Sequence, residues 1–324
     1  MAYENRLRLS ENDLQDWIAL HYGLDVSIGM IRSGYMSTVV WLKTHSEQFV
    51  FKVYGEEVFK QITYGMDVTD HLRENGLPVV ACIPSLHGDF LVDLFGQKAA
   101  LWSCLPGDVF TPGNQVQIWA AGKMLGQFHR VTHSVSKNSA NRLTVERIVE
   151  ELQVTWDLVV DKEGRAIVEI FRDYLAEVTV VARDGWSETI VHCDYRAQNL
   201  LFASNNVSGI LDLDGSCLGP RIFDVVYALA FFQAVIADGP LSESEMVGFL
   251  KAYHSEAELT SAELDDLSMW LSLALLKGMT LWLRIGYVEN VHDNAKVWID
   301  AYRHFLSQSK PIAKRLVFAL RGNG

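Results

Sequence analysis

Two short stretches in the second half of the sequence carry closely spaced carboxylate and amide side chains. His192 and Asp194 follow a short apolar run, and Asn199 comes five residues after Asp194. A second apolar run, SGILDLD, ends on Asp212 and Asp214. Because side chains alternate along a strand, we expect Asp212 and Asp214 to leave the same face. These groups would then gather at one end of a small hairpin, and such hard oxygen donors suit Mg²⁺, which keeps coordination positions open for phosphate.

The pattern H-x-D-x-x-x-x-N, with a further aspartate on the following strand, resembles the catalytic loop and the metal-binding aspartate of kinases. The continuation ILDLDGSCLGPRIFDVVYALAFF is similar to the aminoglycoside phosphotransferase family, which includes choline kinases and bacterial homoserine kinases. In that family an aspartate on a buried strand is followed by a loop, a proline and a second aspartate that opens a helix. The matching residues here are Asp212, Pro220 and Asp224. The resemblance implies a small-molecule kinase that moves the γ-phosphate of ATP or GTP onto a hydroxyl group.

The same resemblance implies a role for each residue of the loop. Asp194 would accept or orient the proton of the acceptor hydroxyl, while Asn199 and Asp212 would hold Mg²⁺ against the phosphates. His192 would brace the loop. Asp214 would be either a second metal contact or a loop cap.

Three residues around the loop have separate interpretations. Arg196, two residues after Asp194, is hypothesised to face the transferring phosphate, where positive charge stabilises the transition state; the alternative is a surface arginine. Asp224 is expected to cap the helix that begins near Val225 and to tie it back to the loop. His129, in LGQFHRVTH, is interpreted as a packed structural histidine.

Lys52 is the single charge in the apolar stretch FVFKVY. It is either a snorkelling edge residue or the strand lysine that pairs with the nucleotide α- and β-phosphates, and the downstream loop favours the second role. The turn at Ser33 and Gly34 precedes it between two expected strands, as a phosphate-covering loop does. By resemblance, the backbone from Ser103 to Leu105 would meet the nucleobase.

Two features depart from the family pattern. A glutamate should follow Lys52 and pair with it, but Gly65 stands near the expected position, and Glu56, Glu57 and Asp67 all remain candidates. The catalytic loop reads CDYRAQN, without the proline or glycine common in the family.

The resemblance runs in order from about Val26 to Gly286 and implies an α+β, two-lobed protein-kinase-like fold. An antiparallel-sheet lobe over residues 1–104 would bind the nucleotide. A mostly helical lobe over residues 105–324 would carry the catalytic loop and the acceptor site. Local patterns agree, because β-branched and aromatic residues dominate residues 26–54, whereas helical periodicity dominates after Pro106.

The expected elements follow from these patterns. A helix should start at Ser10, and a second should run from about Glu56 to Glu74 and end before Gly76. Strands are expected up to Ser33, over Thr38–Lys43 and Gln48–Tyr54, as a pair within LVDLFGQKAALWSCL, and over Ile190–His192, Leu200–Phe202 and Val207–Leu213. Helical regions are expected over residues 114–133, 144–183, 222–237, 243–254 and 261–309.

Composition narrows the classes of partner. The chain has 324 residues and a formal net charge of −12, so no basic excess is present to neutralise a nucleic-acid backbone. The acidic balance is compatible with a cationic acceptor. The four cysteines form no C-x-x-C pair and the N-terminus has no apolar signal core, so we expect reduced thiols in a cytoplasmic protein. The apolar stretch Leu267–Leu283 is interrupted by Lys277 and Gly278, which favours a buried helix over a membrane span.

Other functions stay open at this point. A kinase fold could serve as a catalytically weak nucleotide-binding regulatory module, but Lys52, Asp194, Asn199 and Asp212 are all intact. A hydrolase built on His192, Cys193 and Asp194 is disfavoured, because neighbouring strand residues point to opposite faces. Protein-kinase activity is disfavoured by the absence of an A-P-E segment after Asp212. The identity of the acceptor, ATP versus GTP and the oligomeric state are not readable; candidate acceptor contacts are Trp270, Trp282, Tyr287 and Glu289.

Overall fold

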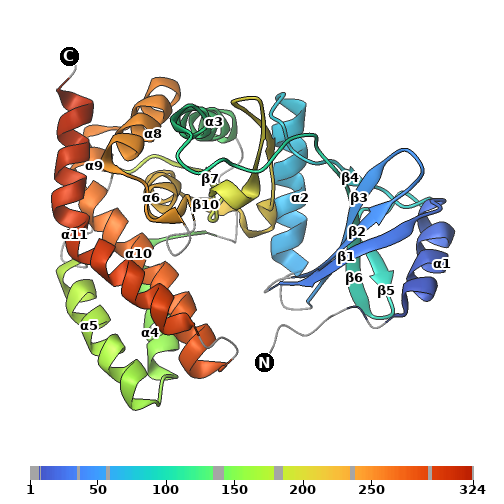
Figure 1. Cartoon of the computed structure of the whole chain (residues 1–324), viewed down its shortest axis with the longest axis horizontal. Helices are drawn as coiled ribbons and strands as arrows, with labels where there is room; N and C mark the ends of the chain where they lie inside the picture. The colour runs from blue at the N-terminus through green and yellow to red at the C-terminus, as the bar shows by residue number, and fades with distance from the viewer. Residues whose placement is uncertain are drawn as a thin grey trace. The chain divides into compact units, whose positions relative to one another are not determined.

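The computed structural model describes residues 7, 9–34, 37–55, 59–133, 142–178, 185–233, 238–290 and 294–322. The chain forms two compact units (Figure 1). The first unit comprises Met1–Pro106 together with Gly209–Asp214, and the second comprises Gly107–Ser208 and Gly215–Gly324. The sequence-based division after Cys104 assigned Gly209–Asp214 to the second part, whereas the structure packs this segment with the first.

The first unit is built on an antiparallel sheet in the order β1-β2-β3-β6-β4, with β5 paired to β6. The three predicted strands before residue 55 and the predicted pair around Gly96 are confirmed. The strands are β1 (Ser27–Ser33), β2 (Ser37–Lys43), β3 (Gln48–Tyr54), β4 (Cys82–Ile83), β5 (Val92–Leu94) and β6 (Gln97–Ser103).

Local signals set the ends of these elements. Helix α1 (Glu11–Tyr22) begins where the Asp13 N–H donates to Ser10 Oγ, as predicted, and ends at Gly23 with a φ of 68°. Strands β5 and β6 are joined through Phe95 and Gly96, with φ values of 52° and 85°. Two successive positive φ angles are typical of the tight turns that match the twist of a hairpin.

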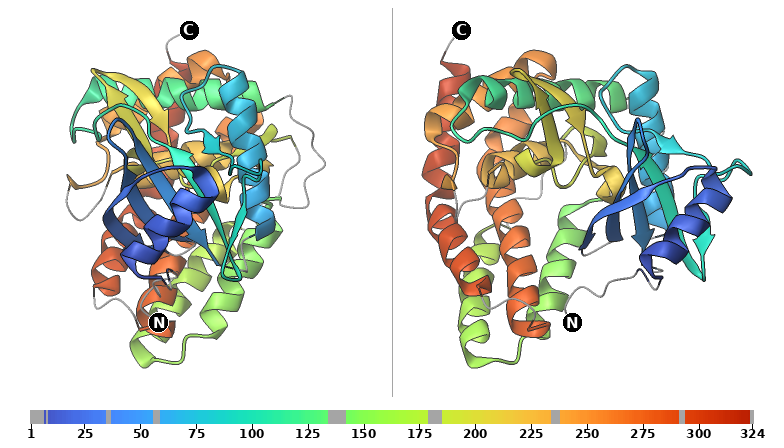
Figure 2. Two further views of the ribbon diagram at one scale, coloured as in Figure 1. Left: turned by 90° about the vertical axis from the view of Figure 1, so that its right-hand side faces the viewer. Right: turned by 45° about the vertical axis from the view of Figure 1, so that its right-hand side comes forward.

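The two faces of the sheet pack against different helices (Figure 1 and Figure 2). Helix α1 contributes Leu14 and Ile18 to the cluster on one face, together with Phe51 and Val53 of β3. Helix α2 (Phe59–Glu74) contributes Ile62 to the smaller cluster on the other face. Since side chains alternate along β3, Lys52 lies on the face that packs against α2.

The second unit is mostly helical and holds two small hairpin-like sheets. Strands β7 (Glu188–Val191) and β10 (Cys217–Pro220) pair antiparallel, and β8 (Leu200–Ala203) pairs with β9 (Asn206–Ile210). The helices are α3 (Gln115–Thr132), α4 (Val145–Asp157), α5 (Lys162–Val178), α6 (Ile222–Phe231), α8 (Glu243–Glu256), α9 (Ser261–Asp265), α10 (Leu267–Leu283) and α11 (Ala295–Arg321). The prediction of an α+β fold with a sheet-rich first part and a mostly helical remainder is confirmed.

Several boundaries differ from the sequence-based expectation. The helical region 144–183 contains a break, because α4 ends at Asp157 and α5 begins at Lys162 with Asp161 Oδ1 accepting from Glu163 N–H and Gly164 N–H. The region 261–309 is divided among α9, α10 and α11. Strand β10 was not predicted; its small residues give a weak strand signal.

Helix α10 and its π-helical continuation η5 (Arg284–Val288) form the most apolar helical run. By length and composition, Leu267–Val288 could cross a membrane, with a mean hydropathy of 1.2 in its most apolar window. Yet 56% of that window is buried inside the protein, where α10 packs against α6 and α11. The environment is that of a core helix, in agreement with the buried helix expected from the sequence.

Candidate active site

In the first unit, Lys52 is bound by two carboxylates from the Gly209–Asp214 segment. The Lys52 ammonium lies 2.6 Å from Asp214 Oδ2 and 3.1 Å from Asp212 Oδ1. Asp214 is buried, whereas the side chain of Asp212 is 50% exposed. Among the described residues, these two carboxylates are the ones within ion-pair distance of Lys52. Of the three partners considered from the sequence, Asp67 is exposed and makes no such pair, and Glu56 and Glu57 lie outside the described residues.

The ion pairs decide the charge of Lys52. Burial by itself would lower the pKa of the lysine, but the carboxylates of Asp214 and Asp212 outweigh it and hold the pKa well above its ordinary value. Lys52 is therefore a permanent cation. The snorkelling alternative is wrong, because the side chain is only 15% exposed and ends on two carboxylates.

The backbone around Asp212 explains why both aspartates reach Lys52. The expected alternation along a strand to Asp214 is wrong: β9 ends at Ile210, and Asp214 lies in a 3-10 turn, η4 (Leu213–Gly215). Asp212 adopts a φ of 62°, a region that non-glycine residues occupy at a cost of about 1–3 kcal/mol and mostly at functional sites. The segment is fixed to the first unit where the Ile210 N–H donates to the Pro78 carbonyl at 2.7 Å.

Gly65 of α2 makes the closest approach to this segment. A Cβ at Gly65 would lie 2.7 Å from the Leu213 carbonyl oxygen and 3.2 Å from the Asp214 Cα. The helix backbone thus packs directly on the turn between the two aspartates. This contact accounts for the glycine at the position where the family pattern has a glutamate, because a side chain there would displace the turn.

In the second unit, the Asp194 carboxylate is held by three side chains. Tyr227 donates its hydroxyl to Asp194 Oδ1 at 2.7 Å, and Arg196 Nε lies 3.1 Å from the same oxygen. Asn199 Nδ2 donates to Asp194 Oδ2 and to the Asp194 carbonyl, both at 2.8 Å. The carboxylate nevertheless remains 30% exposed. An oriented and accessible carboxylate has the geometry that a general base requires.

The orientation of the Asn199 amide follows from these bonds. Its nitrogen donates to the loop, so the carbonyl oxygen Oδ1 is the atom that Asn199 can offer to a cation. This carbonyl oxygen in the second unit and the half-exposed Asp212 carboxylate in the first unit are each hard oxygen donors of the kind that Mg²⁺ prefers. Among the described residues, no group of three or more histidine, cysteine, aspartate or glutamate side chains is arranged to hold a metal.

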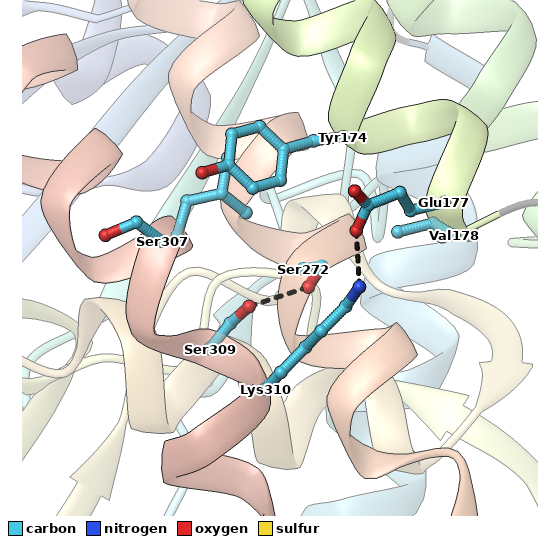
Figure 3. A pocket seen from close by; sticks show the side chains of 8 residues that line it. Tyr174, Glu177, Val178, Ser272, Ser307, Ser309 and Lys310 are labelled. Atoms are coloured by element: carbon cyan, nitrogen blue, oxygen red, sulfur yellow. Dashed lines mark hydrogen bonds and ion pairs between the residues drawn. The ribbon is translucent and has the colours of Figure 1, made fainter.

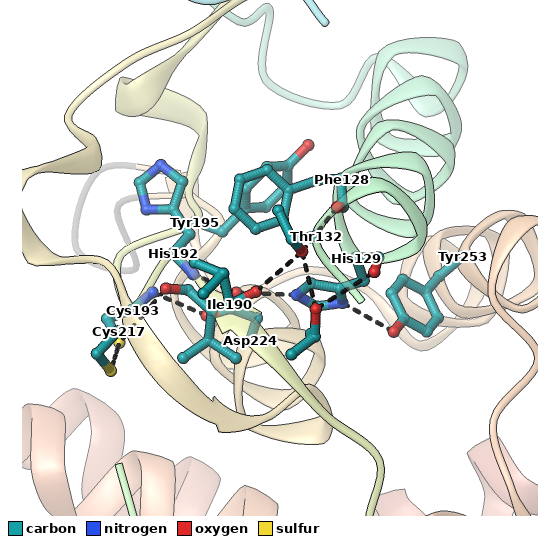
Figure 4. Close-up of polar contacts among 12 residues, drawn as sticks. Phe128, His129, Thr132, Ile190, His192, Cys193, Tyr195, Cys217, Asp224 and Tyr253 are labelled. Atoms are coloured by element: carbon teal, nitrogen blue, oxygen red, sulfur yellow. Dashed lines mark hydrogen bonds and ion pairs between the residues drawn. The ribbon is translucent and has the colours of Figure 1, made fainter. Parts of the chain in front are cut away.

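The buried Asp224 carboxylate fixes the backbone that leads to Asp194 (Figure 4). The His192 N–H donates to Asp224 Oδ2 at 2.6 Å, and the Cys193 N–H donates to Oδ1 at 2.9 Å. Asp224 therefore ties α6 back to the loop, as predicted. The predicted capping role is wrong: α6 begins at Ile222, and Asp224 lies within its first turn with both oxygens turned to the loop.

His129 of α3 completes this anchor. Its Nε2 lies 3.1 Å from Asp224 Oδ2, and its Nδ1 lies 2.8 Å from the Tyr253 hydroxyl. Burial lowers the pKa of His129 despite the neighbouring carboxylate, so the ring is neutral. Nε2–H then donates to Asp224, and Nδ1 accepts from Tyr253. This is the packed structural histidine expected from the sequence.

The loop itself is strained next to the base. Cys193 has a φ of 68°, and its Sγ lies 3.4 Å from Sγ of Cys217 on β10 (Figure 4). The Cys217 thiol and burial raise the pKa of Cys193 well above its ordinary value, so a thiolate nucleophile is disfavoured. His192 Nδ1 accepts from the Asp194 N–H at 3.3 Å, which agrees with a bracing role. The geometry gives the hydrolase interpretation no activated cysteine.

The residues predicted to contact the nucleotide are all in the first unit. Ser33 ends β1, and the Gly34 N–H donates to the Ser37 carbonyl at 2.8 Å, closing a hairpin whose tip at residues 35–36 lies outside the described residues. Ser103 ends β6, and its Oγ accepts from the Ala81 N–H at 2.8 Å. Leu105 follows in the half-buried connection. Their contacts with a nucleotide stay predictions.

A small cavity of about 150 Å³ lies elsewhere in the second unit, among α5, α10 and α11 (Figure 3). Inside it Ser272 and Ser309 share a hydrogen bond of 2.9 Å, and Lys310 pairs with Glu177. None of the predicted site residues lines the cavity.

Two residues of the site were missed from the sequence. Tyr227 follows Asp224 by three residues, the spacing of neighbours on one helix face, which would have indicated it once the helix start was known. Cys217 was noted as a reduced thiol, but its pairing with Cys193 depends on β10. Of the acceptor-site candidates, Trp270 is fully buried, whereas Trp282 stacks on Trp298 at 4.8 Å between ring centroids.

Comparison with known proteins identifies the family. Residues 28–264 match the Phosphotransferase enzyme family. A homoserine kinase from Methylobacillus glycogenes is 24% identical over 276 residues, which span 85% of this chain and 84% of the relative. An amicoumacin kinase solved with AMP-PNP, Ca²⁺ and Ami aligns with a TM-score of 0.73 at 17% identity, over 96% of this chain and 97% of that one. A microcompartment-associated aminopropanol kinase aligns with a TM-score of 0.66 at 14% identity, over 97% and 98% of the two chains.

The fold and the two groups of residues define a kinase-like phosphotransferase. The chain belongs to the Phosphotransferase enzyme family, since the match covers well over half of its length. It is a small-molecule kinase of that family, and the resemblance drawn from Lys52 and the loop around Asp194 is confirmed.

Proposed function

We propose that this kinase transfers the γ-phosphate of ATP, or of GTP, to the hydroxyl of a small amino alcohol, with Asp194 as the base. The observation that carries the proposal is the Asp194 carboxylate, which hydrogen bonds from Tyr227 and Asn199 and an ion pair with Arg196 orient while leaving it accessible. Asp194 would accept the acceptor's hydroxyl proton as the acceptor oxygen attacks the γ-phosphorus, and the nucleoside diphosphate would leave. Such transfer depends mainly on positioning and electrostatic stabilisation.

In this proposal most of the residues that bind the nucleotide come from the first unit. Lys52, a permanent cation, would bind the α- and β-phosphates. Asp212 and Asn199 would hold Mg²⁺, which neutralises phosphate charge when bound. Arg196, which pairs with Asp194 in this structure, would turn to stabilise charge on the transferring group. The roles of Ser33, Gly34, Ser103 and Leu105 in covering the phosphates and meeting the nucleobase remain part of this proposal.

An amino alcohol is favoured as acceptor over a larger, aminoglycoside-like molecule. The homoserine kinase from Methylobacillus glycogenes matches across most of both chains, and an aminopropanol kinase shares the fold. The net charge of −12 is compatible with a cationic acceptor. An aminoglycoside-like acceptor is the second candidate, because an aminoglycoside phosphotransferase from Alicyclobacillus acidocaldarius shares the fold with a TM-score of 0.64.

The test is Mg²⁺-dependent phosphate transfer from radiolabelled ATP and GTP to a panel of acceptors. The panel contains homoserine, aminopropanol, ethanolamine, choline and aminoglycosides. Asp194→Asn is the critical variant, and Asp157→Asn, which changes an exposed aspartate paired with Arg172, is its matched control. We expect transfer to one amino alcohol, abolished in Asp194→Asn and unchanged in Asp157→Asn.

Nucleotide titration on the same samples separates the remaining outcomes. Nucleotide binding without transfer to any acceptor would favour a regulatory module with a kinase fold. Transfer to aminoglycosides alone would keep the kinase reaction but replace the substrate class. Transfer that survives Asp194→Asn would refute the assignment of the base.

A further inference from the structure

Tyr227 is a hydrogen-bond donor to the Asp194 carboxylate to which the kinase resemblance assigns no role. Its hydroxyl lies 2.7 Å from Asp194 Oδ1. Burial and the Asp194 charge raise the pKa of Tyr227 well above its ordinary value, so the hydroxyl keeps its proton and acts as a donor.

The same helix face holds the loop at two points. Asp224 and Tyr227 are three residues apart on α6, so their side chains leave neighbouring positions of one face. Asp224 accepts from the His192 and Cys193 N–H groups, and Tyr227 donates to the Asp194 side chain. Helix α6 thereby fixes first the backbone of the loop and then the carboxylate that follows it.

The ring of Tyr227 is packed so that its hydroxyl has little freedom. It lies between the rings of Phe223 and Phe231, at centroid distances of 5.8 and 4.8 Å. Phe231 in turn lies 4.7 Å from the ring of Tyr302 on α11. A Cβ at Gly278 of α10 would approach Phe231 Cζ to 2.3 Å, so the Phe231 ring fills the space that this glycine leaves. Three helices thus limit the movement of the Tyr227 ring.

Each oxygen of the Asp194 carboxylate accepts one hydrogen bond, from Tyr227 at Oδ1 and from Asn199 at Oδ2, and Arg196 adds an ion pair on the Oδ1 side. A carboxylate oxygen has about two acceptor directions, so the carboxylate is held at both oxygens and still has a direction left for a further proton.

We propose that Tyr227 is a positioning residue for the base, which holds Asp194 Oδ1 and so fixes the orientation in which the carboxylate meets the acceptor hydroxyl. This inference rests on the proposed function, in which Asp194 takes that proton. When Arg196 turns to the transferring phosphate, Tyr227 remains as the donor that keeps the carboxylate in place. The residue acts through Asp194, so it changes the rate of transfer and not the binding of either substrate.

The test is steady-state kinetics of Tyr227→Phe with the acceptor identified in the panel. Phenylalanine keeps the packed ring and removes only the hydroxyl. We expect kcat to fall roughly 10- to 100-fold, the factor that one hydrogen bond to a charged group represents, while the KM for the acceptor and the Kd for the nucleotide change less than about 2-fold. Tyr195→Phe is the matched control, because its buried hydroxyl donates to the Ala121 carbonyl at 2.9 Å and not to the base.

Each result bears on the inference separately from the proposed function. A kcat of Tyr227→Phe within about 2-fold of the wild type, with Asp194→Asn inactive, would overturn the positioning role and leave the proposed function standing. Full activity of Asp194→Asn would overturn the proposed function itself. An equal loss of kcat and melting temperature in Tyr227→Phe and Tyr195→Phe would show that the hydroxyl supports the fold only, and would also overturn the inference.

Discussion

Replacing Gly65 with alanine should destabilise the first unit, although the same change stabilises most helices. In a helix interior, Gly→Ala normally gains about 0.5–1 kcal/mol, because alanine loses less backbone entropy on folding. At Gly65 the new methyl group would lie 2.7 Å from the Leu213 carbonyl oxygen, well inside van der Waals contact. Overpacking of this kind costs about 1–3 kcal/mol. The net loss of stability is then about 0–2.5 kcal/mol, with a midpoint of about 1 kcal/mol.

Gly248 of α8 provides the matched control, because no atom lies within 4 Å of a Cβ built there. Gly248→Ala should gain about 0.5–1 kcal/mol. Urea unfolding followed by circular dichroism measures both variants, and the phosphate-transfer assay follows them in parallel. Gly65→Ala should also weaken nucleotide binding, because Leu213 stands between Asp212 and Asp214. Equal stabilisation of the two variants would show that α2 does not press on the turn, and would refute the reasoning.

Three further predictions concern the second unit. Asp224→Asn replaces one of the two carboxylate oxygens that accept from backbone N–H groups by an NH₂ group, so one of these donors loses its acceptor. The change should lower the free energy of unfolding by about 1–3 kcal/mol and should also lower kcat; an unchanged urea midpoint and turnover would contradict the anchoring role. Because the folded-state pKa of His129 is lowered, its contribution to stability is complete above about pH 6.5 and is lost as the pH falls below that value. The melting temperature of His129→Gln should therefore fall less than that of the wild type between about pH 7 and pH 5. Parallel plots of melting temperature against pH for the two proteins would argue against this. Arg196→Ala should reduce kcat about 10-fold or more with little change in acceptor KM, and unchanged turnover would show that Arg196 is only a surface arginine.

The sequence predicted the elements that have strong local signals. The strands around Lys52 contain β-branched and aromatic residues between turn residues, and β3 forms where this pattern occurs. The start of α1 followed from the Ser10 side chain and its bond to the Asp13 N–H. These features depend on neighbours in sequence, so composition and spacing are sufficient to find them.

The parts that could not be predicted depend on contacts distant in sequence. The partner of Lys52 was sought on the following helix, yet it comes from Asp214, 162 residues away. Asp212 leaves the strand geometry through a positive φ, which residue type does not indicate. The bond from Tyr227 to Asp194 depends on how α6 packs against the loop, and the sequence alone gives only its helical spacing from Asp224.

The ion pairs of Lys52 have a consequence for the order in which ligands bind. In this structure Lys52 is already paired with both aspartates. A nucleotide that arrives alone must draw Lys52 away from those carboxylates, and a cation that arrives alone must draw Asp212 away from Lys52. When both bind, the phosphates of the nucleotide replace the aspartates as partners of Lys52, and the cation replaces Lys52 as the partner of Asp212. The cost of separating Lys52 from Asp212 is then offset by the new contacts of both ligands. Cation and nucleotide should then show positive thermodynamic linkage, each raising the affinity for the other by the same factor.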